Sequence, residues 1–367
     1  MKNVGFFTGS RSEYGLSVSL LKELQIEKEI NLLIYPNGLH LLNAYGNTVN
    51  EIKKDGFNIG REINTYTEKG KEKIYELTDS INKIFSIINN ETLDVIIVCG
   101  DRIEAYATAL AAHFANIPLF HIGGGVITKG AIDNIYRFNI SNLATAHFVT
   151  CKSAYERLSK LDIIDPNNLY LSGSTAIDLI IKMQRNPIGL NRIVEDLDYN
   201  FCIMTFHPVT KAKEKISELM DYSIQVIINH GINIVITYPN NDIGSLNIQD
   251  VINKWKNHKN IFVKKSLGSK KYFSLIKYSK FIIGNSSSGV IEVPYFNKIS
   301  FNIGSRQDGR EKDKSVVDIK AKKTDIKNSI NKYVNNDSKL YKCANLYGSG
   351  SSNRIILNVI KKKLRIN

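Results

Sequence analysis

The chain lacks several features that mark secreted, metal-binding and membrane proteins. Its four cysteines among 367 residues are Cys99, Cys151, Cys202 and Cys343. They show neither metal-ligand spacing nor the density of a disulfide framework. No apolar run approaches the roughly 20 residues of a membrane span. Met1 is followed by a strand-like Val4-Gly5-Phe6-Phe7, without a basic leader. We therefore expect a cytoplasmic protein with reduced thiols, no metal and no membrane association.

An acidic excess and a dinucleotide motif are also missing. Lys and Arg number 49 against 35 Asp and Glu, a formal charge of +14. Such an excess suits nucleic acid, an anionic membrane surface or a phosphorylated substrate. The densest basic run, 361–365, has no interleaved aromatics, so we expect a solvated surface and no nucleic-acid partner. Residues 9–15 lack the Gly-x-Gly-x-x-Gly spacing, which disfavours hydride chemistry.

Short β-branched runs alternate with helical patterns, which predicts an α/β protein with two Rossmann-like doubly wound domains. The expected strands are 4–7, 30–36, 94–100, 117–122, 146–150 and 168–172, then 200–206, 232–238, 260–264, 281–284 and 299–303. Residues 71–89 have apolar positions at helical spacing, and 305–325 are polar enough to predict a loop. We place the domains at 1–173 and 174–350, with a C-terminal helix at 351–367 that packs back on the first domain.

Residues 281–294 carry the strongest single signal for a phosphate site. The apolar Phe281-Ile282-Ile283 suits a buried parallel strand, and it ends at Gly284 before three serines. Small side chains let a ligand approach the backbone, and the N–H groups at a helix start favour a phosphate. Glu292, one turn into the expected helix, is placed to accept hydrogen bonds from a ribose. An ordinary serine N-cap explains the same pattern, so the neighbouring motifs must decide.

Polar residues follow nearly every expected strand, at the edge where open parallel sheets bind ligands. Each has an ordinary explanation by itself, such as a turn or a structural histidine, but their recurrence predicts a cleft lined by both domains. The segments are 8–15, 37–40, 101–102, 123–125, 207–210, 239–242 and 304–307.

The motifs also occur in a specific order along nearly the whole chain. The blocks are 8–15, 38–41, 100–105, 121–125, 132–137, 205–210, 238–242, 284–289, 302–310 and 347–350. In this order they resemble the hydrolysing UDP-N-acetylglucosamine 2-epimerases, which supply the sialic, legionaminic and related nonulosonic acid pathways. The resemblance implies a glycosyltransferase-B-like architecture of two Rossmann-like domains with an interdomain cleft. It also implies a UDP- or GDP-linked sugar as substrate, no cofactor, and a homo-oligomer, either dimer or tetramer.

Site residues follow from the matching positions. The resemblance implies that the nucleotide is held by Arg11, Arg102, His207, Asn240, Ser286, Ser287, Gly289, Glu292 and Arg306. Arg102 would also face the sugar, together with the catalytic set Asp101, His121, Asp133 and Arg137 and the sugar contacts His40 and Gly124. Ordinary alternatives stay open: Asp101 as a helix N-cap, Asp133 as a solvated helix-start charge, and both histidines as structural residues.

The chain departs from the family pattern near the sugar. Members commonly carry an acid in the His-Ile-x-Gly-Gly-x block, where this chain has Gly123 and Val126. Asn134 stands where an acid is frequent, and Phe138 where a histidine is usual. The nucleotide half is therefore complete while part of the acid–base set is missing. A different sugar, a different base and lost epimerisation all stay open.

The chemistry implied by the resemblance needs two carboxyl groups. The C2 hydrogen of an N-acetylhexosamine is removed as the diphosphate leaves C1, which gives a glycal; an acid then protonates the other face while water adds at C1. We expect a hydrolysing 2-epimerase that releases a free ManNAc-type sugar and a nucleotide diphosphate, with Asp101 and Asp133 as the remaining carboxyls. The alternatives are a nucleotide-sugar hydrolase without epimerisation, a glycosyltransferase, and a nucleotide-sugar-binding protein without catalysis.

Overall fold

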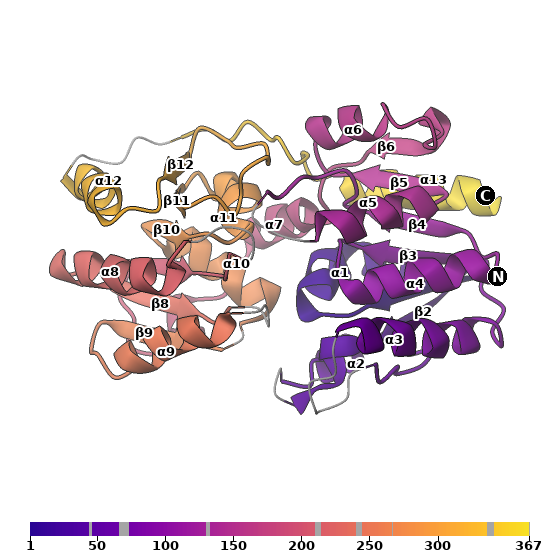
Figure 1. Ribbon diagram of the computed structural model, residues 1–367, viewed down its shortest axis with the longest axis horizontal. Coiled ribbons are helices and arrows are strands. Elements are labelled where there is room, and N and C mark those ends of the chain that lie inside the picture. Colours follow the sequence, from indigo (N-terminus) through magenta and orange to yellow (C-terminus); the bar gives the residue numbers. More distant parts are fainter. Residues whose placement is uncertain are drawn as a thin grey trace. The chain divides into compact units, whose positions relative to one another are not determined.

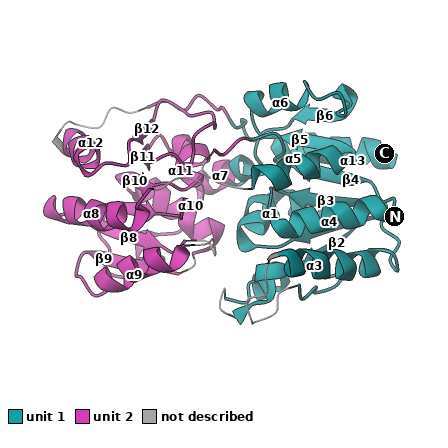
Figure 2. Cartoon of the chain, viewed as in Figure 1, with its two compact units in different colours: residues 1–126, 133–179, 347–367 teal, residues 127–132, 180–346 magenta. Residues whose placement is uncertain are grey.

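The computed structural model describes residues 1–43, 46–65, 73–129, 133–209, 214–239, 244–265, 267–335 and 341–366 (Figure 1). The chain divides into two compact units, coloured separately in Figure 2. Unit 1 comprises Met1–Val126, Asp133–Leu179 and Tyr347–Asn367; unit 2 comprises Ile127–Ile132 and Ile180–Leu346. Each unit contains a six-stranded sheet of its own, so each is described by itself.

Unit 1 is a doubly wound parallel sheet in the order β2-β1-β3-β4-β5-β6. Its strands are β1 (Lys2–Thr8), β2 (Ile30–Pro36), β3 (Val95–Cys99), β4 (Leu119–Ile122), β5 (Ala146–Val149) and β6 (Leu169–Leu171). Its helices are α1 (Arg11–Ile26), α2 (Val49–Lys54), α3 (Lys73–Ile88), α4 (Ile103–Phe114), α5 (Asn134–Leu143), α6 (Lys152–Leu158), α13 (Ser352–Leu364) and the 3₁₀ turns η1 (Gly38–Leu41) and η3 (Pro166–Asn168). β3 is apolar and buried along its whole length, as a central strand covered on both faces must be.

Unit 2 repeats this architecture with the order β12-β11-β10-β7-β8-β9, again all parallel. Its strands are β7 (Phe201–Thr205), β8 (Asn233–Thr237), β9 (Ile261–Lys264), β10 (Phe281–Gly284), β11 (Ile299–Ile303) and β12 (Val316–Ile319). Its helices are α8 (Ile216–Asn229), α9 (Ser245–Trp255), α10 (Gly268–Tyr278), α11 (Ser288–Ile291), α12 (Lys323–Asn335) and the 3₁₀ turns η4 (Leu190–Arg192) and η5 (Val293–Phe296). The helix α7 (Thr175–Arg185) begins in unit 1 and ends in unit 2.

The predicted fold class, two Rossmann-like doubly wound domains, is confirmed. Each expected strand is present, and the expected helix at 71–89 is α3 within the described residues. The loop predicted for 305–325 is wrong in part, because β12 lies inside it and pairs with β11 at the edge of the sheet. The predicted interdomain cleft stays a prediction, since each unit is described by itself.

Within unit 1, buried polar contacts join residues 174–178 to the C-terminal segment that begins at Tyr347. The Asp178 carboxylate accepts hydrogen bonds from the N–H groups of Ser352 and Asn353 at 3.1 and 3.2 Å, which caps the start of α13. Ser174 N donates to Tyr347 O at 2.8 Å. The apolar side of α13 joins the same core as α1. Residues 174–179 therefore belong with unit 1, and the segment Ile127–Ile132 belongs with unit 2, where Lys129 N donates to Asp308 O.

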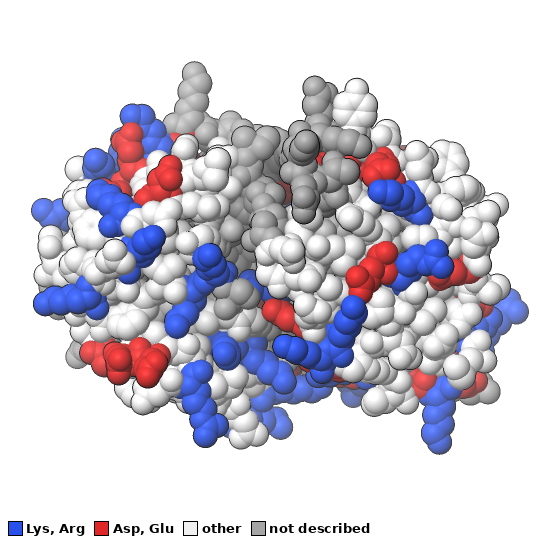
Figure 3. Space-filling view, turned by 90° about the horizontal axis from the view of Figure 1, so that it is seen from below, with Lys and Arg blue, Asp and Glu red and all other residues white. Residues whose placement is uncertain are grey.

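The surface carries its charges in a mixed pattern. On the face drawn in Figure 3, lysines and arginines lie scattered among acidic side chains and uncharged surface. In the described part of the chain, no helix has the length and apolar character needed to cross a membrane.

Candidate functional site

The strand order of unit 1 places its ligand-binding edge. β1 lies between β2 and β3, and the chain winds away from β1 in both directions, so the crevice beyond the carboxyl ends of β1 and β3 is the switch point where such sheets bind ligands. The residues that follow these two strands are Gly9–Arg11 and Gly100–Arg102. The predicted residues Arg11, Asp101 and Arg102 therefore come from adjacent loops at one edge of the sheet.

Asp101 is held by a buried arginine from α5. The Arg137 guanidinium forms an ion pair with the Asp101 carboxylate and also donates to the Val126 carbonyl and to Asn134 Oδ1. The Arg137 side chain is 5% exposed and that of Asp101 is 23% exposed. Arg137 is thus a support that fixes the carboxylate, and Asp101 is the member of the pair that can reach a ligand. The structure brings these two predicted residues together across 36 positions of sequence.

Asp133 lies one turn before Arg137, at the N-cap position of α5. Its backbone carbonyl accepts the Arg137 N–H at 2.9 Å, and its residue is partly exposed. The side chain of Val126 is buried, while its carbonyl receives the Arg137 guanidinium. Position 126, one of the two places where the resemblance led us to expect an acid, therefore contributes packing and one carbonyl in this chain.

Glu13 is a buried acid that the sequence analysis did not single out. Its Oε2 accepts hydrogen bonds from Gly9 N at 2.8 Å and Ser10 N at 3.0 Å, as the N3 member of a capping box at the start of α1. These N–H groups are the ones that a phosphate uses at a helix N-terminus, so a carboxyl group of the chain already takes that place. The signal that could have found it is the Ser-x-x-Glu spacing of residues 10–13.

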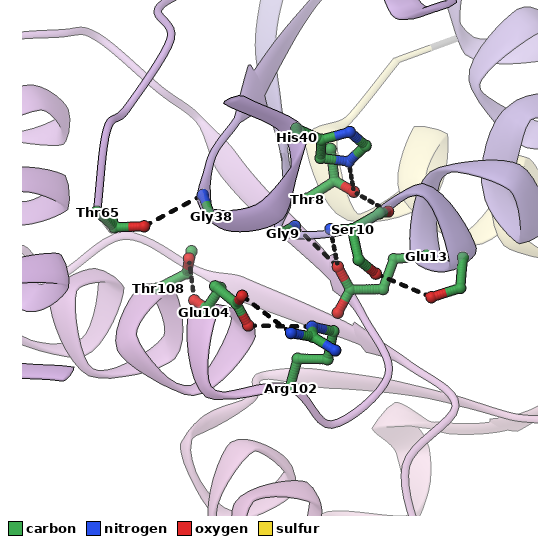
Figure 4. A network of polar contacts seen from close by, with 11 residues as sticks. Thr8, Gly9, Ser10, Glu13, Gly38, His40, Thr65, Arg102, Glu104 and Thr108 are labelled. Carbon is green, nitrogen blue, oxygen red and sulfur yellow. Dashed lines mark hydrogen bonds and ion pairs between the residues drawn. The ribbon is translucent and has the colours of Figure 1, made fainter. Parts of the chain in front are cut away.

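A second ion pair lies beside this turn (Figure 4). Arg102 Nε and Nη2 donate to the two Glu104 oxygens, each at 3.2 Å. The Glu104 carboxyl also packs against the loop glycines: a Cβ at Gly9 or Gly38 would lie 2.7 Å from a Glu104 atom. Arg11 is the first residue of α1 and is partly buried, with Glu51 as an acidic neighbour that acts on its charge.

Burial raises the pKa of the Glu13 carboxyl to about 8, with Glu104 and Asp101 adding to the rise and Arg102 opposing it. The folded state therefore keeps this proton between the ordinary carboxyl value of 4.5 and about 8, where the unfolded chain has lost it. We predict that the free energy of unfolding falls as pH rises through this window, by up to about 1.4 kcal/mol per pH unit. Glu13→Gln, which keeps the shape without the titration, should show a flatter decline in melting temperature between pH 5 and 9. Parallel curves for the two proteins would contradict the raised pKa.

The two histidines predicted near the sugar are fully buried. His40 Nε2 and Nδ1 lie 3.1 and 2.8 Å from the hydroxyl oxygens of Thr8 and Thr48. His121 Nε2 donates to Gly100 O at 2.8 Å. Burial lowers the pKa of both imidazoles to about 4, so both are neutral at pH 7. These surroundings favour the structural alternative for His40 and a positioning role for His121, which supports the loop that carries Asp101.

Gly124 has a packing reason to be glycine. A Cβ at this position would lie 2.6 Å from Ser141 Oγ and 3.0 Å from His121 Nδ1. The first contact is closer than real Cβ atoms come to other atoms, so a side chain here would force the Ser141 hydroxyl or the His121 ring to shift. Its predicted contact with the sugar stays a prediction.

In unit 2, the switch point lies between β10 and β7. Asn285, which follows β10, links the two strand ends: its Oδ1 accepts His207 N at 2.6 Å and its Nδ2 donates to His207 O at 2.8 Å. The Asn285 side chain is fully buried, and its carbonyl accepts Arg306 Nη1 at 3.3 Å and Gln307 Nε2 at 2.9 Å. Asn285 thus joins the motif blocks 205–210, 284–289 and 302–310. We did not identify this asparagine as a site residue from the sequence.

The serine turn has a conformation that requires glycine at its start. Gly284 has φ +142°, and a Cβ there would lie 1.9 Å from Thr205 O. The helix after the turn is shorter than predicted: α11 is one turn, and Pro294 lies in the 3₁₀ turn η5 that follows. Ser287 is at the N-cap of α11, and Ser286 Oγ accepts Ser288 N at 3.4 Å.

Glu292 is the C-cap of α11 and is almost fully buried. Burial raises the pKa of its carboxyl, with Arg310 opposing the rise. Its Oε2 has no hydrogen-bond partner among the described residues, which leaves an acceptor for a ligand hydroxyl. Gly289 packs on β11, since a Cβ there would lie 2.5 Å from Ser300 Oγ.

His207 is buried, and burial together with the charge of Arg306 lowers the pKa of its imidazole well below the ordinary value. It is therefore a neutral hydrogen-bonding residue at pH 7. The predicted Asn240 lies outside the described residues. Across the parts of the chain that the structure describes, no three His, Cys, Asp or Glu side chains gather in a group that could hold a metal ion.

Comparison with known proteins gives consistent matches. Residues 22–361 match the protein family described as UDP-N-acetylglucosamine 2-epimerase. A UDP-N,N'-diacetylbacillosamine 2-epimerase (hydrolyzing) of Legionella pneumophila is 30% identical over 98% of this chain and 96% of its own. The polysialic acid biosynthesis protein P7 of Escherichia coli is 32% identical over 90% of this chain and 86% of its own. The solved UDP-GlcNAc 2-epimerase of Neisseria meningitidis, bound to UDP-GlcNAc, superimposes with a TM-score of 0.82 at 18% identity, over 99% of this chain and 100% of its own.

Proposed function

Because the chain belongs to the UDP-N-acetylglucosamine 2-epimerase family, we propose that it is a hydrolysing 2-epimerase of a nucleotide-linked 2-acetamido sugar. Its products would be the free C2-epimerised sugar and a nucleotide diphosphate. The observation that carries the proposal is the partly exposed Asp101, fixed by the buried Arg137 one turn after Asp133. Two carboxyl groups are what the reaction at C2 requires.

The proposed reaction has two stages. Asp101 accepts the C2 proton as the bond from C1 to the diphosphate oxygen breaks, which leaves a glycal and the nucleotide diphosphate. Asp133, in its protonated form, then donates a proton to the opposite face of C2, and water adds its oxygen to C1. The proton that this water loses restores Asp133, and Asp101 releases its proton to solvent. Arg137 fixes the Asp101 carboxylate through their ion pair. Negative charge develops on the departing diphosphate, where each preorganised donor is worth about 3 kcal/mol in comparable sites.

The departing diphosphate is stabilised, in this proposal, by the residues around Asn285. We propose that Arg306 and His207 bind the diphosphate, that the serine turn lies against it, and that the unpartnered Glu292 Oε2 accepts a ribose hydroxyl. We also propose Arg11 and Arg102 of unit 1 as nucleotide-binding residues, as the resemblance implies. The neutral state of His207 suits it to hydrogen bonding.

Arg306→Ala should weaken UDP binding at least about tenfold, because a hydrogen bond from a charged donor is worth about 1.5–3 kcal/mol. Isothermal titration calorimetry with UDP measures this directly. Lys327→Ala removes an exposed cation from α12 and serves as the matched control, with no expected change. Equal dissociation constants for wild type and Arg306→Ala would remove this arginine from the proposed site.

The sugar and the nucleobase are tested with a panel of nucleotide sugars. The name of the Legionella relative suggests UDP-N,N'-diacetylbacillosamine, and the family description suggests UDP-GlcNAc. We expect release of a nucleotide diphosphate from a UDP-linked 2-acetamido sugar without any acceptor. Turnover only in the presence of an acceptor would favour the glycosyltransferase alternative instead.

A nucleotide-sugar hydrolase without epimerisation is the second candidate. It is favoured by the apolar residues at 123 and 126, since the buried Val126 offers no acid–base group. One carboxylate is enough to activate water at C1, whereas epimerisation needs a second group for the other face. The configuration of the product at C2 separates the two candidates.

Assembly and location complete the proposal. We propose that the chain acts in the cytoplasm as a homo-oligomer. Large exposed apolar side chains on neighbouring helices of unit 1 support self-association: Ile74 and Tyr75 on α3 and Phe114 on α4.

A further inference from the structure

The cluster formed by Glu13, Asp101, Arg102, Glu104 and Arg137 contains three carboxyl groups and two guanidinium groups. Arg137 is paired with Asp101, and Arg102 is paired with both oxygens of Glu104. Glu13 is the third carboxyl of this cluster, and it interacts electrostatically with Asp101, Arg102 and Glu104. Both arginines are thus engaged by other acids, so a charge on Glu13 would make the cluster of five groups net negative.

The two Glu13 oxygens lie in different surroundings. Oε2 accepts the N–H groups of Gly9 and Ser10, whereas Oε1 is buried and has no hydrogen-bond partner among the described residues. In Figure 4 the Glu13 carboxyl and the Arg102–Glu104 pair lie on the same side of this turn. Oε1 faces the bend after β3: a Cβ at Gly100 would lie 4.0 Å from it, in ordinary van der Waals contact.

Glu13 is 6% exposed and lies at the N3 position of α1, beside the switch point. An unpaired buried carboxylate oxygen is costly, whereas a carboxylic acid places its proton there. Burial, the unpartnered Oε1 and the charges of Glu104 and Asp101 favour the uncharged form, and they outweigh Arg102 and the N–H groups on Oε2, which favour the ionised form.

Beyond the two ion pairs, the nearby Cys99 and His40 are uncharged at neutral pH. Burial raises the pKa of the Cys99 thiol to about 12 and lowers that of the His40 imidazole to about 4. Arg11, at the start of the same helix, has its acidic neighbour in Glu51. Between pH 7 and 9.5, Glu13 is therefore the group of this cluster whose charge changes, since its pKa lies at about 8.

We propose that Glu13 is a positioning residue whose proton sets the charge of the unit 1 edge, so that the protein binds a nucleotide diphosphate tightly while Glu13 is uncharged and more weakly once it ionises. The physical reason is simple electrostatics. When Glu13 is protonated, each of the two ion pairs has no net charge, and Arg11 adds one positive charge. Without it, the Oε1 carboxylate is a further negative charge near a bound dianion, inside a poorly screened environment.

This inference rests on the proposed function, because Arg11 and Arg102 at this edge are among the residues proposed to bind the nucleotide. Linkage then requires that binding of the diphosphate raises the proton affinity of Glu13. UDP is a suitable probe, because its terminal phosphate has lost its proton well below pH 8. A shift of about one pKa unit on binding would give an uptake of about half a proton per UDP near pH 8.5, and a dissociation constant that rises about five- to tenfold from pH 7 to pH 9.5.

The experiment is calorimetry of UDP binding to the full-length protein at pH 8.5, in two buffers with different ionisation enthalpies. We expect proton uptake by wild type and none by Glu13→Gln, whose amide oxygen still accepts the Gly9 and Ser10 N–H groups. Glu29→Gln, at an exposed position just before β2, removes one carboxylate elsewhere and should behave as wild type. The dissociation constant of Glu13→Gln should stay within about twofold from pH 7 to pH 9.5.

Binding without proton uptake by wild type, or equal uptake by Glu13→Gln, overturns the inference and leaves the proposed function intact. Absence of UDP binding overturns both. Failure to epimerise contradicts the proposed function alone, because UDP binding does not involve C2. If Glu13→Gln folds poorly, the wild-type uptake at pH 8.5 compared with pH 6.5 decides, since Glu13 is already protonated at the lower pH and no uptake through it is expected there.

Discussion

Asp133→Asn should lower kcat by about 10²- to 10⁴-fold while UDP binds with nearly unchanged affinity. The carboxyl group is removed from its position one turn before Arg137, so C2 loses one of its two proton-transfer groups. Stability should hardly change, because Asn is as good an N-cap residue as Asp and the Asp133 side chain makes no cap hydrogen bond. The measurement is steady-state turnover of the nucleotide sugar, with UDP affinity from calorimetry.

The matched control is Asp162→Asn, which removes a carboxylate from an exposed position of unit 1 and should leave kcat unchanged. Asp101→Asn is a less clean variant, because it strips the buried Arg137 of its anion and should cost stability as well as turnover. If Asp133→Asn weakened UDP binding and left kcat intact, the assignment of Asp133 to proton transfer would be wrong.

The largest expected effect on stability comes from Gly284→Ala. The added methyl would lie 1.9 Å from the Thr205 carbonyl oxygen, and φ at this residue is +142°, which L side chains rarely adopt. Strands β10 and β7 are paired at this point, so neither backbone can move without breaking the sheet. We expect a loss of at least about 3 kcal/mol in the free energy of unfolding, and loss of UDP binding through displacement of Asn285.

Gly231→Ala is the control for this prediction. Gly231 has φ +67° but nothing within 4 Å of its Cβ position. Gly231→Ala therefore measures the cost of a positive φ without a steric clash, about 1 kcal/mol in the free energy of unfolding. Urea unfolding of the three proteins measures both costs. A Gly284→Ala protein as stable as Gly231→Ala would show that the close approach of the two strand ends is not as described.

Much of the fold could be predicted because its strands are central and apolar. β3 and β10 are buried along their whole length, and a short continuous apolar run is typical of a parallel strand that is covered on both faces. β12 was missed because it has only four residues, lies at the sheet edge and is flanked on both sides by polar segments, which hide its short apolar run. The C-terminal helix was expected to pack on the first domain, and α13 shares a core with α1.

The site was predicted less completely, because its pairings depend on tertiary structure. The resemblance named Asp101 and Arg137 separately, but their ion pair depends on how α5 packs beside the ends of β3 and β4. The resemblance implied a sugar contact for His40, which stays a prediction, and the two hydroxyl partners of its buried ring could not be read from the sequence. Asn285 was overlooked among small residues, although it joins the ends of β7 and β10. Its role is visible only once the two strands are adjacent.

Reaction in deuterated water, followed by NMR of the released sugar, tests the central claim most directly. The account predicts a free sugar with inverted configuration at C2 and deuterium at that carbon, together with the nucleotide diphosphate, and Asp133→Asn should lose this product. A released sugar with the original C2 configuration and no deuterium would contradict it, and would leave hydrolysis without epimerisation as the activity of this chain.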